Sequence, residues 1–86
     1  MDDERIHDRI RMFVLKHSPA ARRRTLRDTD QLLEQGIIDS LAVLNLVAYL
    51  EQEFKIAVSD DDLTPDNFQS IDRLAAFVTA KGNGGH

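Results

Sequence analysis

The chain has 86 residues, of which 42% are hydrophobic and 30% charged, so it suits one small folded domain with little room for a deep enclosed active site. It contains no Cys, which excludes disulfides and thiolate metal sites and leaves the apolar core to hold the fold together. The net charge of −4 divides into +4 over residues 1–27 and −8 over residues 28–86, and this acidic majority favours basic protein partners over nucleic acid.

The first predicted element is an amphipathic helix over residues 3–17, which Pro19 stops. Its apolar side chains recur at helical spacing and share one face: Ile6, Ile10, Phe13 and Val14. His17 falls near the same stripe at the C-terminal end of the helix. We interpret it as a packed or dipole-stabilised histidine, because no second ligand or catalytic partner stands at a useful spacing.

A long first loop, residues 18–38, follows this helix, and a connection of that length in so small a domain should carry local structure. Asp30 is expected to cap a short turn that ends at Gly36, because glycine suits the left-handed conformation after a helix. The run Arg22–Arg24 has no adjacent aromatic to stack a base, so we interpret it as a solvated stretch. Five apolar side chains are expected to fasten the loop to the core: Leu26, Leu32, Leu33, Ile37 and Ile38.

Residues 40–54 are predicted to form a helix of about four turns with two apolar strips. The core-facing stripe consists of Val43, Leu46, Val47, Leu50 and Phe54. The second strip, on another side of the helix, consists of Leu41, Leu44 and Ala48. In so small a bundle we expect only one of these strips to be fully buried and the other to meet a partner.

A short third helix is predicted around residues 60–68. Ser59 and Asp62 form a variant of the capping box, and Pro65 suits a first helical position. The acidic run Asp60–Asp62 lacks the loop spacing of a calcium site, and no metal ligand set is predicted. It reads instead as a negatively charged helix start, which the helix dipole favours.

Ser70 is expected to cap a final helix that Gly82 ends, and the tail at 82–86 is expected to be disordered. The apolar side chains of this helix share a face, with Phe77 on its flank: Ile71, Leu74, Ala75 and Val78. Together the elements predict an all-α fold over residues 1–81. It is a small four-helix bundle with three longer helices, one short third helix and a long structured first loop.

The segment Gly36-Ile37-Ile38-Asp39-Ser40-Leu41 carries an Asp-Ser-Leu motif at the start of a long helix, and here the chain resembles the acyl carrier and peptidyl carrier family, of the stand-alone type. The resemblance covers about residues 4–80, including the Leu63–Phe68 turn and the closing helix. It implies that Ser40 is joined by a phosphodiester to 4'-phosphopantetheine, whose terminal thiol carries the cargo as a thioester.

A phosphate on Ser40 would meet the unpaired N–H groups and the positive dipole end of a helix. Ser40 is also interpreted as a cap of the helix, and that role does not exclude its modification. No His or Lys stands near Ser40 in sequence to activate its hydroxyl. A separate phosphopantetheinyl transferase is therefore expected, and the resemblance implies that this enzyme uses coenzyme A and a divalent metal. Asp39 either supports the motif for that enzyme or is simply a charge near a helix start.

The resemblance implies that the second strip, Leu41, Leu44 and Ala48, is a partner-docking face flanked by Glu51. Ala42 and Asn45 stand where carriers of the fatty-acid-synthase type have acids, so two charges are missing. This favours an apolar interface to specialised enzymes of a polyketide, nonribosomal peptide, aminoacyl or dedicated fatty acid pathway.

The sequence thus predicts a carrier, not an enzyme, that delivers an acyl or aminoacyl group between separate enzymes. Its expected partners are the transferase and an acyl- or aminoacyl-loading ligase, synthase or transferase. It is expected to be a cytoplasmic monomer with no nucleic-acid or membrane partner. An alternative is an unmodified helical adaptor that binds a partner through the second strip. A hydrolase built from Ser40, an acid and His7 or His17 ranks far below, because nothing places those groups together.

Overall fold

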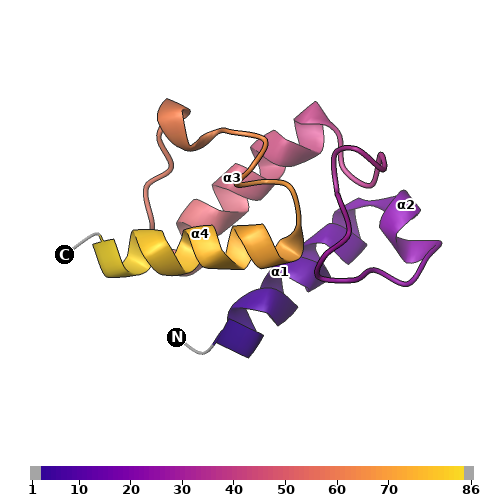
Figure 1. Cartoon of the computed structure of the whole chain (residues 1–86), viewed down its shortest axis with the longest axis horizontal. Helices are drawn as coiled ribbons and strands as arrows, with labels where there is room; N and C mark the ends of the chain where they lie inside the picture. Colours follow the sequence, from indigo (N-terminus) through magenta and orange to yellow (C-terminus); the bar gives the residue numbers. More distant parts are fainter. Residues whose placement is uncertain (1–2, 85–86) are drawn as a thin grey trace.

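The protein is described by a computed structural model that places the backbone of residues 3–84 and the side chains of residues 5–82. The elements follow the order α1 (Asp3–His17), α2 (Pro19–Arg22), α3 (Ser40–Phe54), the 3-10 helix η1 (Asp60–Asp62) and α4 (Ile71–Gly84) (Figure 1). Every regular element in the described range is helical, which confirms the predicted all-α fold. None of these helices is long and apolar enough to cross a membrane.

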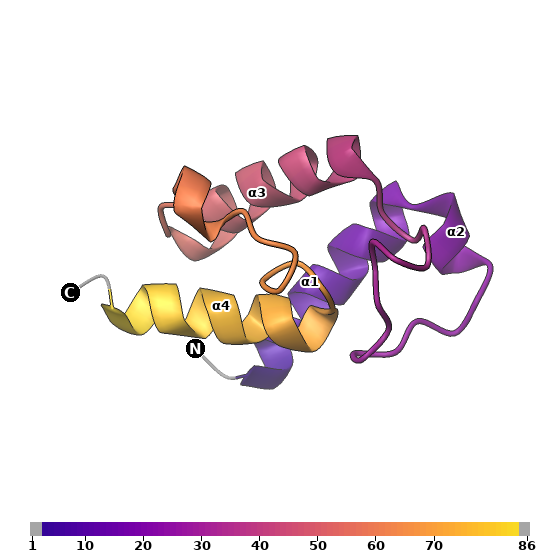
Figure 2. The same ribbon diagram turned by 45° about the horizontal axis from the view of Figure 1, so that its top comes forward.

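The three long helices enclose one core. Helices α1 and α4 pack against each other, and α3 packs against both (Figures 1 and 2). The predicted stripe of α1 is buried at Ile6, Ile10 and Val14, because apolar residues at this spacing lie on one side of a helix. The other fully enclosed large side chains come from α3, α4 and the connections between the helices: Leu32, Leu46, Leu50, Phe68, Ile71 and Leu74.

The short helix α2 lies within the first loop and was not predicted. Pro19 stops α1, as expected, but it also occupies the start of α2, where its missing N–H costs nothing. Ser18 caps α2 by accepting a hydrogen bond from Ala21 N at 3.1 Å. Arg22 is not simply solvated, because its guanidinium donates to the carbonyl oxygens of Leu15 and Lys16 at the end of α1.

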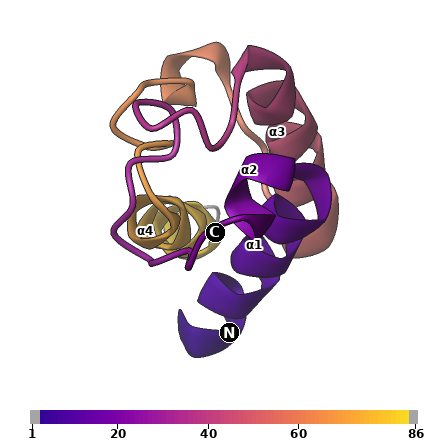
Figure 3. The same cartoon turned by 90° about the vertical axis from the view of Figure 1, so that its right-hand side faces the viewer.

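The first loop leaves α2, passes the start of α4 and returns to the start of α3 (Figure 3). Gly36 has the predicted left-handed conformation, with φ at +68°. The prediction for Asp30 was wrong in direction, since its carboxylate accepts from Arg27 N, three residues earlier, at 2.9 Å. Asp30 therefore closes the preceding turn and does not cap the following one. The loop is tied to the start of α4 by a 2.8 Å bond from Leu32 N to the carbonyl oxygen of Gln69.

The predicted third helix is much shorter than expected, since only η1 at residues 60–62 is helical. The capping box between Ser59 and Asp62 is present as predicted. After η1, side chains form hydrogen bonds with backbone groups that would otherwise bond within a helix. Asn67 Nδ2 donates to the Asp62 carbonyl oxygen, and Thr64 Oγ1 accepts from Asn67 N. Pro65 has no N–H to donate, so the segment continues as turns.

Helix α4 runs two residues beyond its predicted end at Gly82, to Gly84. Residues 82–84 of the predicted disordered tail are helical, and residues 85–86 lie outside the described chain. Ser70 caps α4 as predicted, accepting from Arg73 N at 3.2 Å. The face of α4 that was assigned to the core is buried, and Phe77 is buried with it.

One ion pair connects η1 to the end of α4 and should make the stability of the protein depend on pH. Lys81 Nζ lies 2.7 Å from Asp62 Oδ2, which also accepts from the N–H and hydroxyl of Ser59. The bond from Lys81, followed by those from Ser59, lowers the pKa of Asp62 from 3.8 to about 2. A carboxyl whose pKa is lowered by folding adds stability that is fully present above its ordinary pKa and is lost as the pH falls towards 2.

We therefore expect Asp62→Asn to flatten the fall in melting temperature between a pH of about 4 and a pH of about 2. Thermal melts monitored by circular dichroism at several pH values would measure it. Asp61→Asn is the matched control, because Asp61 is exposed in the same turn and makes no ion pair with any residue of the described chain. An Asp62→Asn variant that loses as much stability on acidification as the Asp61→Asn control would contradict the prediction.

Candidate functional site

The start of α3 is fixed by Asp39, not by Ser40. Asp39 is the N-cap residue, in extended conformation, and its Oδ1 accepts from Ala42 N at 2.8 Å. Its carbonyl oxygen accepts the first helical bond, from Val43 N. The reading of Ser40 as the cap is therefore corrected: Ser40 is the first residue inside the helix, and its hydroxyl is not used for capping.

The segment before α3 is held rigidly against the core. Ile37 and Ile38 are buried, and both of their N–H groups donate to the carbonyl oxygen of Leu32. The buried hydroxyl of Ser18 donates to the Ile37 carbonyl oxygen, which ties the end of α1 to this segment. Satisfied buried bonds of this kind fix a backbone position. The exposed Ser40 hydroxyl is thus presented from a well-supported helix start.

Ser40 borders an open groove of about 220 Å³, which we call the Ser40 groove. Its walls come from the first loop, from α3 and from the connection between η1 and α4. Apart from Ser40 and Thr64, its lining is apolar: Leu33, Val43, Leu63, Pro65 and Phe68. Leu33 was expected to be a core contact, but it remains 37% exposed as a wall of this groove.

The described chain supplies no base for Ser40. Its hydroxyl makes no hydrogen bond to any residue that the structure places, histidine and lysine included. His17 instead stacks on Phe13, with ring centroids 4.3 Å apart, and His7 Nε2 lies 2.8 Å from Asp72 Oδ1. The hydrolase arrangement is therefore not assembled. An exposed serine without its own base is suited to accept a group that a second protein transfers.

The two apolar strips of α3 differ in burial as expected. Leu46 and Leu50 are buried, whereas Leu41 and Leu44 of the second strip are 66% and 61% exposed. Ala48 is exposed as well. The remaining members of the core-facing stripe are half-buried against the core: Val43, Val47 and Phe54. The helix is thus rotated as predicted, and the role of the second strip in docking stays a prediction.

Glu51 has a structural contact that sequence reasoning missed. Its Oε2 accepts from Val58 N at 3.0 Å, beyond the end of α3. The helix ends at Phe54, and its C-cap Lys55 adopts a left-handed conformation with φ at 57° that takes the chain out of the helix. No local sequence signal indicates this bond, because it depends on how the following segment folds back.

A cluster of charged groups joins α1, the first loop and the start of α4. The ligand atoms of His7, Asp28 and Asp72 lie within 4.8 Å of one another. Arg11 pairs with Asp28, so a cationic side chain already balances that carboxylate. The arrangement is explained as a network of one ion pair and one hydrogen bond that links α1 to the first loop and to the start of α4. Sequence reasoning missed it because His7 and Asp72 are 65 positions apart.

Comparisons of the sequence with known proteins place the chain in a family. Residues 20–78, which include the start of α3 and the Ser40 groove, match the family described as "Phosphopantetheine attachment site". The chain is similar to the probable acyl carrier protein PigG of a Serratia strain, at 36% identity over 47 residues, which is 55% of this chain and 54% of that protein. It is also similar to the acyl carrier protein AsbD of Bacillus anthracis, at 32% identity over 53 residues, which is 62% and 58% of the two chains.

The matched part of the chain spans somewhat more than half the length of these relatives. The family match confirms the resemblance that the Asp-Ser-Leu segment indicated, and with it 4'-phosphopantetheine as the covalent group. The relatives are named as carriers, which agrees with the predicted class of protein. The chain belongs to the phosphopantetheine attachment site family.

Proposed function

We propose that this protein is an acyl or aminoacyl carrier, not an enzyme, and that its 4'-phosphopantetheine arm is attached to Ser40. One observation carries the proposal: within the matched segment, an exposed hydroxyl that no described residue hydrogen-bonds lies on the first turn of α3 beside an apolar groove. When attached, the arm supplies a terminal thiol that holds the cargo as a thioester.

The surrounding residues fit such a group. The positive end of the α3 dipole favours a phosphodiester at Ser40. Asp39 uses its carboxylate to hold Ala42 N–H and so fixes the position of the next residue, Ser40, for a transferase. The Ser40 groove offers an apolar surface of Leu33, Leu63 and neighbouring residues on which a flexible chain leaving Ser40 can rest.

The carrier works with separate enzymes. These are a phosphopantetheinyl transferase, which takes the arm from coenzyme A, and loading and receiving enzymes of a specialised pathway. We place the protein as a monomer in the cytoplasm, where coenzyme A is available. Its docking face is the second strip of Leu41, Leu44 and Ala48 with Glu51 at its edge, and the exposure of both leucines supports this role.

Intact mass spectrometry after co-expression with a broad-specificity phosphopantetheinyl transferase tests the proposal. A carrier gains the mass of one phosphopantetheine group per chain. An unmodified adaptor that binds a partner through the second strip keeps the mass of its polypeptide. A chain that shows no gain, while a known carrier expressed in the same way is fully modified, would overturn the proposed function.

The docking face makes a second prediction, on salt dependence. Ala42 and Asn45 leave it without two acids, so binding to the native loading enzyme should weaken little when ionic strength rises. The double variant Ala42→Asp/Asn45→Glu should associate faster than the wild type with a basic fatty-acid-synthase enzyme at low salt. It should gain nothing with the native enzyme.

Stopped-flow association rates at low and moderate ionic strength, for both carriers against both enzymes, would measure this. If the association rate of the wild type with the native enzyme fell steeply at moderate ionic strength, charges would govern recognition. That result would contradict the apolar interface. Charges such as Glu51 or the Asp60–Asp62 run would then be the determinants.

A further inference from the structure

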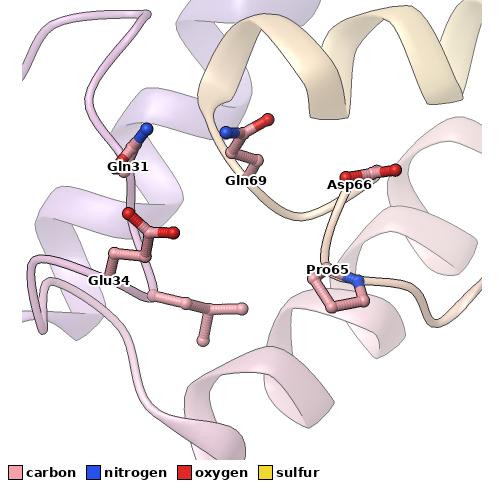
Figure 4. A pocket seen from close by; sticks show the side chains of 6 residues that line it. Gln31, Glu34, Pro65, Asp66 and Gln69 are labelled. Carbon is pink, nitrogen blue, oxygen red and sulfur yellow. The ribbon is translucent and has the colours of Figure 1, made fainter.

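The first loop is joined to the start of α4 by two backbone hydrogen bonds. Leu32 N donates to the Gln69 carbonyl oxygen at 2.8 Å, and Asp72 N donates to the Asp28 carbonyl oxygen at 3.0 Å. Figure 4 shows the part around Gln69, where the first loop and the turn before α4 lie on opposite sides of a small pocket. We call this region the loop–α4 junction.

Helix α1 contacts the loop–α4 junction through two side chains. Arg11 pairs with the carboxylate of Asp28, and His7 Nε2 lies 2.8 Å from Asp72 Oδ1. His7 and Arg11 are four residues apart, so they lie on the same face of α1. The ligand atoms of His7, Asp28 and Asp72 lie within 4.8 Å of one another. The imidazole is therefore close to both carboxylates of the junction.

The carboxylates of this cluster outnumber its permanent cation. Asp8 Oδ1 lies 4.0 Å from Arg11, in addition to the pair between Arg11 and Asp28. The described charged groups around the imidazole are therefore Asp8 and Arg11 of α1, Asp28 of the first loop and Asp72 of α4. With a neutral His7 this group of side chains is negative. A proton on His7 offsets one of the negative charges.

The His7 side chain can exchange protons with solvent. It is 24% exposed and borders an open groove of about 490 Å³ between α1 and α4. Apart from His7 and Asp72, the side chains that line this groove carry no charge: Ala75, Ala76, Thr79 and Ala80. Histidine has an ordinary pKa of about 6.5, whereas aspartate and arginine keep their charges near neutral pH. Only His7 in this cluster is thus expected to change its charge between mildly acidic and neutral pH.

We propose that His7 is a pH-dependent latch, which in its protonated form holds α1 to the loop–α4 junction by pairing with Asp72 beside Asp28. The carboxylates become neighbours of His7 only on folding, because His7 and Asp72 are 65 positions apart. Folding therefore favours the protonated form. The first loop also supplies Leu33 to the Ser40 groove, so the latch fixes a segment that borders the candidate site.

The sign of the pH dependence follows from this preference. A histidine that binds its proton more tightly in the folded chain adds stability that is fully present below about pH 6.5. That stability is lost as the pH rises through the titration of the folded protein. The pKa of Asp62 is about 2, so the ion pair between Asp62 and Lys81 does not change in this range. The inference does not depend on the group that Ser40 carries.

Melting temperatures at a pH of about 5.5 and a pH of about 8 test the latch. His7→Gln keeps an N–H donor for Asp72 and cannot take up a proton. From the higher to the lower pH, the wild type is expected to gain about 2–8 °C relative to this variant. His17→Gln is the matched control, because His17 stacks on Phe13, and it should respond to pH as the wild type does.

Titration of the His7 ring, followed by ¹H–¹³C NMR spectra, tests the partner directly and uses chains that keep His7. Asp72→Asn should lower the midpoint of the His7 titration, and Asp61→Asn, which removes an exposed carboxylate of η1, should leave it unchanged. A midpoint that is the same in the wild type and in Asp72→Asn would overturn the inference. So would a His7→Gln variant whose melting temperature changes with pH as that of the wild type does.

Discussion

Replacing Ser40 with Ala should abolish the mass gain of one phosphopantetheine group while leaving the fold intact. The loss is complete because an alanine has no hydroxyl to form the phosphodiester. The fold is kept because Asp39, not Ser40, caps α3, and the exposed hydroxyl of Ser40 makes no hydrogen bond within the described chain. Alanine is a good helix former, so a change in stability within about 0.5 kcal/mol is expected.

Other serines of the chain provide the control for this experiment. Ser59 is exposed at a helix start, like Ser40, but its hydroxyl donates a hydrogen bond to the carboxylate of Asp62. Ser18 and Ser70 are buried. Ser59→Ala should therefore retain the full mass gain. Intact mass spectrometry and peptide mapping after co-expression with the transferase measure the modification of both variants. A mass gain that persists in Ser40→Ala would show that the arm is attached to another residue.

Replacing Leu50 with Ala should lower the free energy of unfolding by about 2–5 kcal/mol. Leu50 is fully buried where α3 packs into the core, so truncation removes apolar contact and leaves a cavity. Small domains are stable by only about 5–15 kcal/mol, and the loss is therefore a large share of the total. Urea unfolding followed by circular dichroism would measure it.

Leu44→Ala makes the same chemical change on the same helix and serves as the matched control. Leu44 is 61% exposed in the second strip, so its truncation should change stability within about 0.5 kcal/mol. If Leu44→Ala proved as costly as Leu50→Ala, the rotation of α3 would be wrong, and the second strip would belong to the core. Phe54 is only half-buried, so we expect Phe54→Ala to cost less than Leu50→Ala.

The pattern of apolar residues was sufficient to place the three long helices. Helical periodicity is a local property, and it located α1 and α3 with their buried faces, including the contrast between Leu46 and Leu44. The left-handed conformation of Gly36 could also be predicted from the sequence, because few other residues adopt that conformation. The Asp-Ser-Leu segment indicated the family together with its context, which is the long helix that follows it and the rest of residues 4–80, and the family match confirms that interpretation.

The short elements were less predictable. Helix α2 was missed, and the predicted helix at residues 60–68 proved to be a single turn, because start signals such as Pro19 and Pro65 mark a turn without fixing its length. Whether such a turn continues depends on which side chains capture its backbone groups. The side chains of Thr64 and Asn67 form hydrogen bonds with backbone groups of this segment, and the helix does not extend.

The sequence by itself thus determined the helix faces, the family and the serine on which the proposed function rests. Only the tertiary structure decided which groups from distant positions meet. It brought Ser18 to Ile37, Lys81 to Asp62 and the first loop to the turn before α4, and these contacts build the support of α3 and the Ser40 groove. The physical reason is that periodicity and capping are set by neighbours within about one helical turn, whereas a groove or pocket is the space left between segments whose packing optimises the whole core at once.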